Sequence, residues 1–191
     1  MALGNRHIRQ IRESELRLMI SLDGIGDMHD AQRRFANGHG SFSHVARTLD
    51  RLAQHGVTPS LSITLSHCNL AGLPETVAYA LDRGLPFSLN FYRANDYAAG
   101  HADLAFVEEE IIAAMKAAFA VIEQRLPPYR LPGALLDLVR IDAPHDHPCG
   151  VGRAYMVIDQ RGRVAKCHME IERSVTSVDA PDPLRLIRED T

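Results

Sequence analysis

Two groups of residues have types and spacings that could carry chemistry, and the first lies around residue 23. The run Ser21-Leu22-Asp23-Gly24 ends an apolar segment and is followed by His29-Asp30 and by Arg33. Parallel α/β folds place their sites at the carboxyl ends of strands, where this run is expected. A hydroxyl, a carboxylate and a guanidinium there suit a ligand that carries a carboxylate. The alternative is that Asp23-Gly24 only turns the chain and that Arg33 is a solvated charge.

The second group is the pair Cys149 and Cys167. An odd count of three cysteines, with Cys68 the third, argues against a disulfide framework and favours reduced thiols or metal ligands. The pair brackets a predicted hairpin, so two thiolates at its base would suit an iron–sulfur cluster or zinc. Two buried thiols with no ligand are the plain alternative. A zinc site that adds the neighbouring histidines His145, His147 and His168 is a further one.

The elements that must position these groups alternate between strands and helices. Apolar or alternating runs predict strands at Leu16–Leu22, Ser60–Ser66 and Phe87–Tyr92. Helical periodicity predicts helices from Ser41 to Gly56, from Pro74 to Gly84 and from Phe106 to Leu126, with Ser41 as the N-cap of the first. Short connections between alternating strands and helices are typical of a parallel α/β sheet. A β-hairpin is predicted beyond it, with Tyr155–Ile158 and Arg163–Cys167 as strands.

The stretch from Ser21 to Asn69 resembles the middle of a radical S-adenosylmethionine (SAM) barrel of the SPASM type, the group that holds sulfatase and peptide maturases. In those enzymes a strand ending in Ser-Ile/Leu-Asp-Gly precedes a His-Asp pair, an Arg, a Gly-rich segment, a capped helix and a strand that ends near an Asn. The matching residues here are Ser21–Gly24, His29-Asp30, Arg33, Gly38–Phe42 and Asn69. In some members the Ser and an Arg twelve residues later hold the SAM carboxylate. The resemblance therefore implies that Ser21, Asp23, Arg33 and Asn69 lie in a SAM site.

The cysteine pair resembles the opening of a SPASM domain, which has a Cys, a hairpin turn with Gly, and a Cys five residues after that Gly. Cys149, Gly162 and Cys167 follow this order. The resemblance implies that Cys149 and Cys167 help to ligate an auxiliary 4Fe-4S cluster. It covers Leu16 to Met169 and implies an α/β fold. We expect the C-terminal half of a radical SAM β/α barrel, about three βα units, at 1–140, the start of a SPASM-like domain at 141–172, and a disordered tail at 173–191.

By this resemblance the chain is part of a radical SAM/SPASM enzyme that modifies a peptide or protein side chain through a deoxyadenosyl radical. The Cys-x3-Cys-x2-Cys motif of the SAM-cleaving cluster and the later SPASM cysteines are absent from the sequence. We therefore expect a fragment that begins near the fourth barrel strand and is inactive alone. His168 stands where sulfatase maturases place an acidic proton acceptor, which makes it a weak catalytic candidate.

Two rival hypotheses belong to other classes: a non-catalytic scaffold that binds SAM or a peptide, and a small zinc-binding protein. The net charge of −3 disfavours nucleic acid as a partner. No apolar run approaches the roughly 18–20 residues that a membrane span needs, and no secretory signal is visible, so a cytoplasmic location is expected. Open edges of a three-stranded sheet predict self-association.

Overall fold

The computed structural model describes residues 3–92, 104–129, 150–152 and 155–190. The chain divides into two compact units, Met1–Val139 and Arg140–Thr191. Each unit contains a three-stranded sheet of its own. In the described part of the chain, no helix combines the length and the apolar character that crossing a membrane requires.

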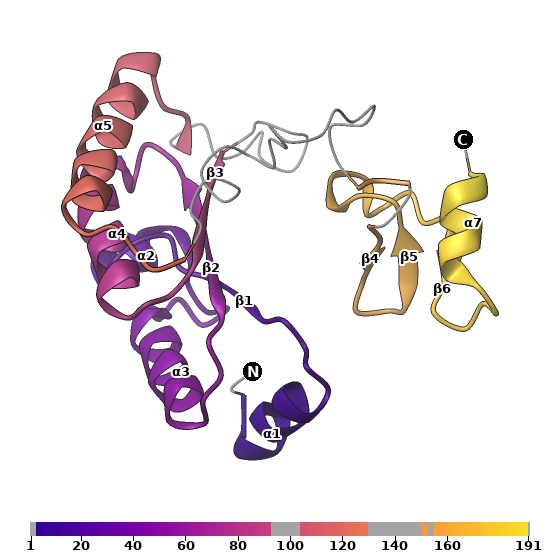
Figure 1. Ribbon diagram of the computed structural model, residues 1–191. Helices are drawn as coiled ribbons and strands as arrows, with labels where there is room; N and C mark the ends of the chain where they lie inside the picture. Colours follow the sequence, from indigo (N-terminus) through magenta and orange to yellow (C-terminus); the bar gives the residue numbers. More distant parts are fainter. Residues whose placement is uncertain (1–2, 93–103, 130–149, 153–154, 191) are drawn as a thin grey trace. The chain divides into compact units, whose positions relative to one another are not determined.

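The first unit is built on a parallel sheet with the strand order β1-β2-β3. Its strands are β1 (Met19–Ser21), β2 (Ser60–Leu65) and β3 (Phe87–Phe91). Its helices are α1 (Asn5–Glu13), α2 (Asp27–Gln32), α3 (Phe42–Gln54), the 3-10 turn η1 (Leu70–Gly72), α4 (Leu73–Asp82) and α5 (Glu108–Gln124). Figure 1 shows α2 to α5 gathered on one side of this sheet. The strands and the helices α3 to α5 confirm the predicted alternation, with ends shifted by a few residues.

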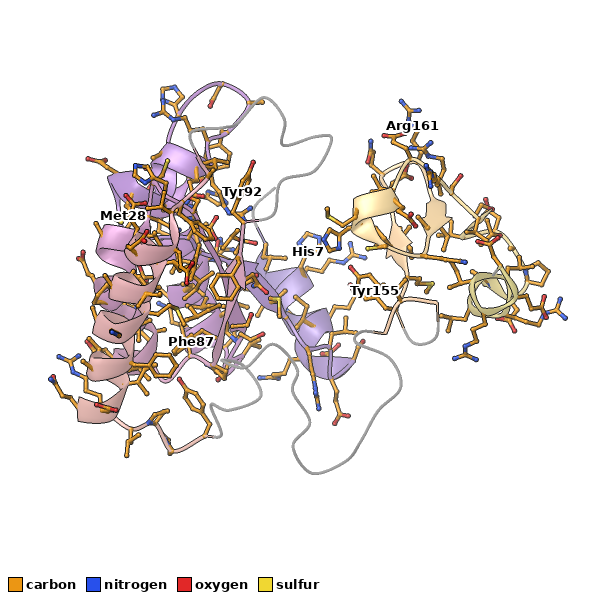
Figure 2. The ribbon with its side chains drawn as sticks, turned by 90° about the horizontal axis from the view of Figure 1, so that it is seen from above. His7, Met28, Phe87, Tyr92, Tyr155 and Arg161 are labelled. Atoms are coloured by element: carbon orange, nitrogen blue, oxygen red, sulfur yellow. The ribbon has the colours of Figure 1, made fainter. Side chains whose placement is uncertain are left out.

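The helix-covered face of the sheet is apolar because every second residue of β2 points into the core. Leu61, Ile63 and Leu65 have no exposed surface, and Phe87 of β3, labelled in Figure 2, is 1% exposed. These side chains pack with apolar residues of the helices into one cluster. Its buried members from the helices and connections are Leu22, Leu49, Leu70, Leu73, Val77, Ala80, Leu85, Ala118 and Ile122.

The opposite face of the sheet is polar, and its residues stand in register across the three strands. Ser21 is paired with Ser62, and Ser62 with Ser88, while Thr64 is paired with Asn90. The Asn90 side-chain amide donates to Ser62 Oγ at 3.0 Å and to Ser88 Oγ at 3.4 Å. Alternation in parallel strands places all of these side chains on one face. In the described part of the first unit, this face therefore offers hydroxyls and an amide.

The described residues of the second unit form an antiparallel sheet and a helix. β4 (Val157–Ile158) pairs with β5 (Arg163–Ala165), and β5 pairs with β6 (Thr176–Ser177). The 3-10 turn η3 (His168–Glu170) and the helix α7 (Pro183–Glu189) complete it. The predicted hairpin is confirmed. Its turn carries Arg161 at the tip, as Figure 2 shows, and Gly162 adopts φ of 75°, which favours glycine.

The hairpin turn is held by one carboxylate. Asp159 Oδ1 accepts from the backbone N–H groups of Arg161 and Arg163 at 2.8 and 2.9 Å, and its Oδ2 accepts from Arg163 Nε at 2.6 Å. Burial alone would raise the pKa of Asp159, but these hydrogen bonds outweigh it and leave the pKa below its usual value.

The structure differs from the sequence-based expectations in three places. β1 is shorter than predicted, and the helices α1 and α2 were not predicted. Where a disordered tail was expected, residues 173–191 contain β6 and α7, because the Asp182 side chain caps the Arg185 N–H at 2.9 Å and Ile187 is buried. In the first unit the described strands form an open parallel sheet with β1 and β3 at its edges, as expected of about three βα units, and this sheet alone does not show a barrel.

Candidate functional site

Asp23 lies at the carboxyl end of β1 and ties three parts of the first unit together. Its side chain is 2% exposed. Its Oδ1 accepts from the Thr64 N–H of β2 at 2.8 Å, and its Oδ2 forms an ion pair with Arg33 Nε. Both carboxylate oxygens are therefore occupied within the protein, so Asp23 fixes the position of Arg33.

Asn69, which follows β2, stabilises the corner of the first unit where the carboxyl ends of β1 and β2 meet. The residue is 2% exposed. Its amide nitrogen donates to the carbonyl oxygens of Asp23 at 2.5 Å and Thr64 at 2.7 Å, and its Oδ1 accepts from the Ser66 N–H at 2.9 Å. Its side chain thus joins the ends of β1 and β2 and closes the turn after β2.

His29, in α2, is fully buried beneath this corner. Its Nδ1 accepts from the Asp23 backbone N–H at 3.1 Å, and its Nε2 lies 3.0 Å from Ser41 Oγ. Burial lowers the pKa of His29, while Asp23 and Asp30 raise it in part and Arg33 lowers it. A neutral imidazole is the form that these contacts require.

Asp30 caps the helix α3, which corrects one prediction. Its Oδ1 accepts from the Ser41 and Phe42 N–H groups at 2.6 and 2.7 Å. The Ser41 side chain, predicted to be the cap, makes no capping bond and donates instead to the Arg33 carbonyl oxygen at 2.6 Å. The carboxylate also explains Gly40, because a Cβ there would overlap the Asp30 side chain.

Gly24 is required by the close approach of α2 to the end of β1. A Cβ at this position would lie 2.9 Å from the His29 backbone nitrogen and 3.0 Å from the Met28 Cβ. Real Cβ atoms do not come this close to a backbone atom, so a larger residue would have to push α2 away from Asp23. The Asp23-Gly24 pair therefore does more than turn the chain.

Ser21 and Arg33 are the two predicted residues that remain accessible to a ligand. Ser21 is half-buried on the polar face, two residues before Asp23. The Arg33 side chain is 41% exposed, and no hydrogen bond of its two terminal nitrogens is recorded among the residues that the structure describes. Arg33 can thus present two N–H groups to a carboxylate while its Nε stays bound to Asp23.

The cysteine site is described only in part, since Cys149, His145 and His147 lie outside the described residues. Cys167 follows β5 and is half-buried, and His168 is exposed, with its Nδ1 3.2 Å from Tyr155 Oη. Cys68 is half-buried after β2, in the other unit. Within the described ranges, no three His, Cys, Asp or Glu side chains come close enough together to hold a metal.

Comparison of sequences finds no family model and no curated protein that matches this chain. Comparison of structures does find solved proteins with a similar fold. They are structures of the anaerobic sulfatase maturase anSMEcpe. One, with bound AdoMet and Cp18Cys peptide, has a TM-score of 0.72 and 14% identity. Another, with bound AdoMet, has a TM-score of 0.70 and 13% identity.

The extent of these matches is uneven. They cover 98% of this chain but only 55% and 53% of the two anSMEcpe chains, so the chain spans about half the length of the structures that it resembles. At this level of identity the likeness is one of fold.

Sequence reasoning missed the hydrogen-bonding roles of His29, Asp30 and Ser41. The sequence indicates the His-Asp pair only as part of a motif and predicts Ser41 only as a helix cap. A histidine in an otherwise polar segment carried no signal of full burial. The one indication of these roles in the sequence is Asp30, an acidic residue with no predicted role that lies eleven residues before Ser41 at the predicted helix start.

Proposed function

We propose that this chain is the SAM- and substrate-binding part of a radical SAM/SPASM enzyme that modifies a peptide or protein side chain. The observation that carries the proposal is the half-exposed Arg33, held at the carboxyl end of a parallel sheet by the buried Asp23. The likeness to the fold of anSMEcpe, solved with bound AdoMet and peptide, supports it.

The residues at this corner fit the amino-acid end of SAM. A guanidinium with two terminal nitrogens suits a carboxylate, and the Ser21 hydroxyl ends β1 two residues before the Asp23 that holds Arg33. We assign contact with the SAM carboxylate to Ser21 and Arg33. Asp23 and Asn69 would fix these contacts in place, since their own polar atoms are occupied.

The polar face of the first unit supports binding of the rest of SAM or of a neutral part of the substrate. Ser62, Ser88 and Asn90 offer hydrogen-bonding groups without charge. When SAM and the clusters are bound, they would supply a carbon-centred radical for hydrogen abstraction. The part of this chain would be to bind and orient the reactants and to exclude water.

The first prediction tests the carboxylate contact. Arg33→Ala should weaken SAM binding about 10-fold or more, because a hydrogen bond to a charged group contributes about 1.5–3 kcal/mol. Arg33→Lys should be intermediate, since it keeps the charge and loses the two-pronged geometry. Titration calorimetry of the full chain with SAM measures both.

A second ligand separates this contact from general damage to the fold. Methylthioadenosine shares the adenosyl group of SAM but lacks the carboxylate, so its affinity should not change in Arg33→Ala. The matched control is Arg34→Ala, the exposed neighbour that donates to the Asp30 carbonyl oxygen. Equal losses for both ligands, or no SAM binding by the unmodified chain, would contradict the proposal.

We further propose that Cys149 and Cys167 ligate an auxiliary 4Fe-4S cluster and that other residues, outside this sequence, hold the SAM-cleaving cluster. Support comes from the sequence resemblance and from the hairpin that ends beside Cys167. The residues described do not by themselves complete such a site. His168, next to Cys167, stays a candidate proton acceptor.

The second prediction tests the cluster. Anaerobic reconstitution with iron and sulfide should give bound iron, bound sulfide and broad visible absorbance. Cys167→Ser should abolish them, while the control Cys68→Ser, in the other unit, should retain them. Stoichiometric zinc with no iron would instead favour the zinc-binding hypothesis.

A further inference from the structure

We propose that His29 is a positioning residue for the SAM carboxylate, acting through a directed chain of hydrogen bonds that sets the backbone of both Asp23 and Arg33. The proposal rests on the function proposed above. His29 is fully buried, so it does not itself touch a ligand. Its two ring nitrogens lead in opposite directions, one to Asp23 and the other, through Ser41, to Arg33.

The direction of each hydrogen bond follows from its donors. The Asp23 backbone N–H can only donate, so His29 Nδ1 is the acceptor and carries no proton. In a neutral ring the proton then sits on Nε2, which donates to Ser41 Oγ. The Ser41 hydroxyl is left to donate to the Arg33 carbonyl oxygen at 2.6 Å. One tautomer of one buried ring satisfies all three contacts.

These contacts form a closed ring with the ion pair. The backbone of Asp23 is joined to the backbone of Arg33 through His29 and Ser41, and the two side chains are joined directly. Asp30, the residue after His29, holds the Ser41 N–H and so fixes the serine in this ring. Loss of one link therefore loosens the carbonyl of Arg33, the residue proposed to bind the carboxylate.

Protonation of His29 should break this closed circuit of hydrogen bonds. A second proton on Nδ1 would set an N–H against the Asp23 N–H and break that contact. The charged groups around the His29 imidazole are Asp23 at the end of β1, Asp30 in α2 and Arg33 after α2. From α3, the Phe42 ring lies against the imidazole, with 6.2 Å between the two ring centroids. Burial lowers the pKa of His29 further than the two carboxylates raise it.

Both the stability of the first unit and its SAM affinity should depend on the ionisation of His29. Because the folded pKa of His29 is lowered, its contribution to stability is fully present above the ordinary value of 6.5 and diminishes as the pH falls toward the folded pKa. SAM affinity should fall at a lower pH, as the pH passes through the folded pKa, because only the folded protein binds SAM and its His29 stays neutral until then. A site that does not depend on His29 would not follow this pH dependence.

The third prediction compares His29→Asn, His29→Gln and Ser41→Ala at pH 8. Asparagine can replace Nδ1 as the acceptor for the Asp23 N–H, and glutamine can replace Nε2 as the donor to Ser41; each keeps one link. Each variant should weaken SAM binding about 10-fold, the effect of losing about one hydrogen bond. Each histidine substitution should also abolish the fall in affinity at low pH. The control is His55→Asn, at the exposed C-cap of α3.

Two readouts separate the failure of this inference from the failure of the proposed function. If the unmodified chain binds no SAM, the proposed function fails. If it binds SAM, and the folded His29 variants keep both its affinity and its pH profile, the inference about His29 is wrong. Long-range proton–nitrogen spectra of the ring test it without any ligand: we expect a proton on Nε2 and none on Nδ1, and the opposite tautomer would overturn the proposal.

Discussion

Replacing Asp23 with alanine should destabilise the first unit by about 3 kcal/mol, since removal of a buried, hydrogen-bonded charged group costs about this much. The side chain is 2% exposed, and its two oxygens serve the Thr64 N–H and Arg33 Nε. Arg33 is 41% exposed, so water will solvate part of its charge once the partner is gone, and the ion pair contributes less than a buried pair would. Most of the loss should come from the Thr64 N–H and from the carboxylate that joined β1 to β2.

Hydrogen exchange of the β2 amides measures this change in the first unit alone, because the second unit has its own sheet. Protection of the Thr64 amide should fall most. Asp23→Asn should cost less than Asp23→Ala, since its amide oxygen can still accept from Thr64. The matched control is Asp27→Asn, an exposed carboxylate in the first turn of α2, which should change exchange by a few tenths of a kcal/mol at most.

An Asp23→Ala variant with unchanged β2 protection would show that the carboxylate is dispensable for the fold. Asp23 would then be free for a ligand role, and the division of labour proposed here, with Asp23 positioning and Arg33 binding, would be wrong.

The fold was predictable from sequence where periodicity is strong. In β2 the alternation of serine or threonine with leucine or isoleucine identifies both the strand and its two faces, and α3 to α5 carry apolar residues at helical spacing. The helices α1 and α2 were missed for physical reasons. α1 is rich in charge and buries only Ile8, and α2 has six residues, too few to show a period.

The sequence predicted which residues make up the candidate site better than it predicted the hydrogen bonds between them. The residue types around Asp23 indicated a site at a strand end, and the structure places Asp23, Arg33 and Asn69 together there. The sequence could not tell which of them face a ligand, because that depends on which polar atoms are already occupied. Occupancy is set by tertiary contacts such as Asn69 to the Asp23 carbonyl, 46 residues apart.

Substitutions at two neighbouring positions of β2, one on each face of the sheet, should have opposite effects: one should lower stability and the other should lower ligand affinity. Ile63→Ala should destabilise the first unit by about 3 kcal/mol, within the usual cost of emptying a fully buried aliphatic site. Ser62→Ala should change stability by about 0.5 kcal/mol or less, since it loses one half-exposed hydrogen bond from Asn90. Urea denaturation followed by circular dichroism, together with exchange of the β2 amides, measures both.

The effects on ligand binding should be in the reverse order, with Ser62→Ala weakening binding more than Ile63→Ala. Ile63 packs against the helices and has no path to a ligand, so Ile63→Ala, measured at a temperature where it is folded, should keep the SAM affinity of the unmodified chain. Ser62→Ala changes the polar face and should weaken binding of SAM or of a peptide substrate while leaving stability intact. A large stability loss in Ser62→Ala would mean that this face is part of a core, and the polar face could not be the binding surface. The pair of neighbours thus tests whether the residues that hold the sheet together and those that bind the ligand are separated by the simple alternation of one strand.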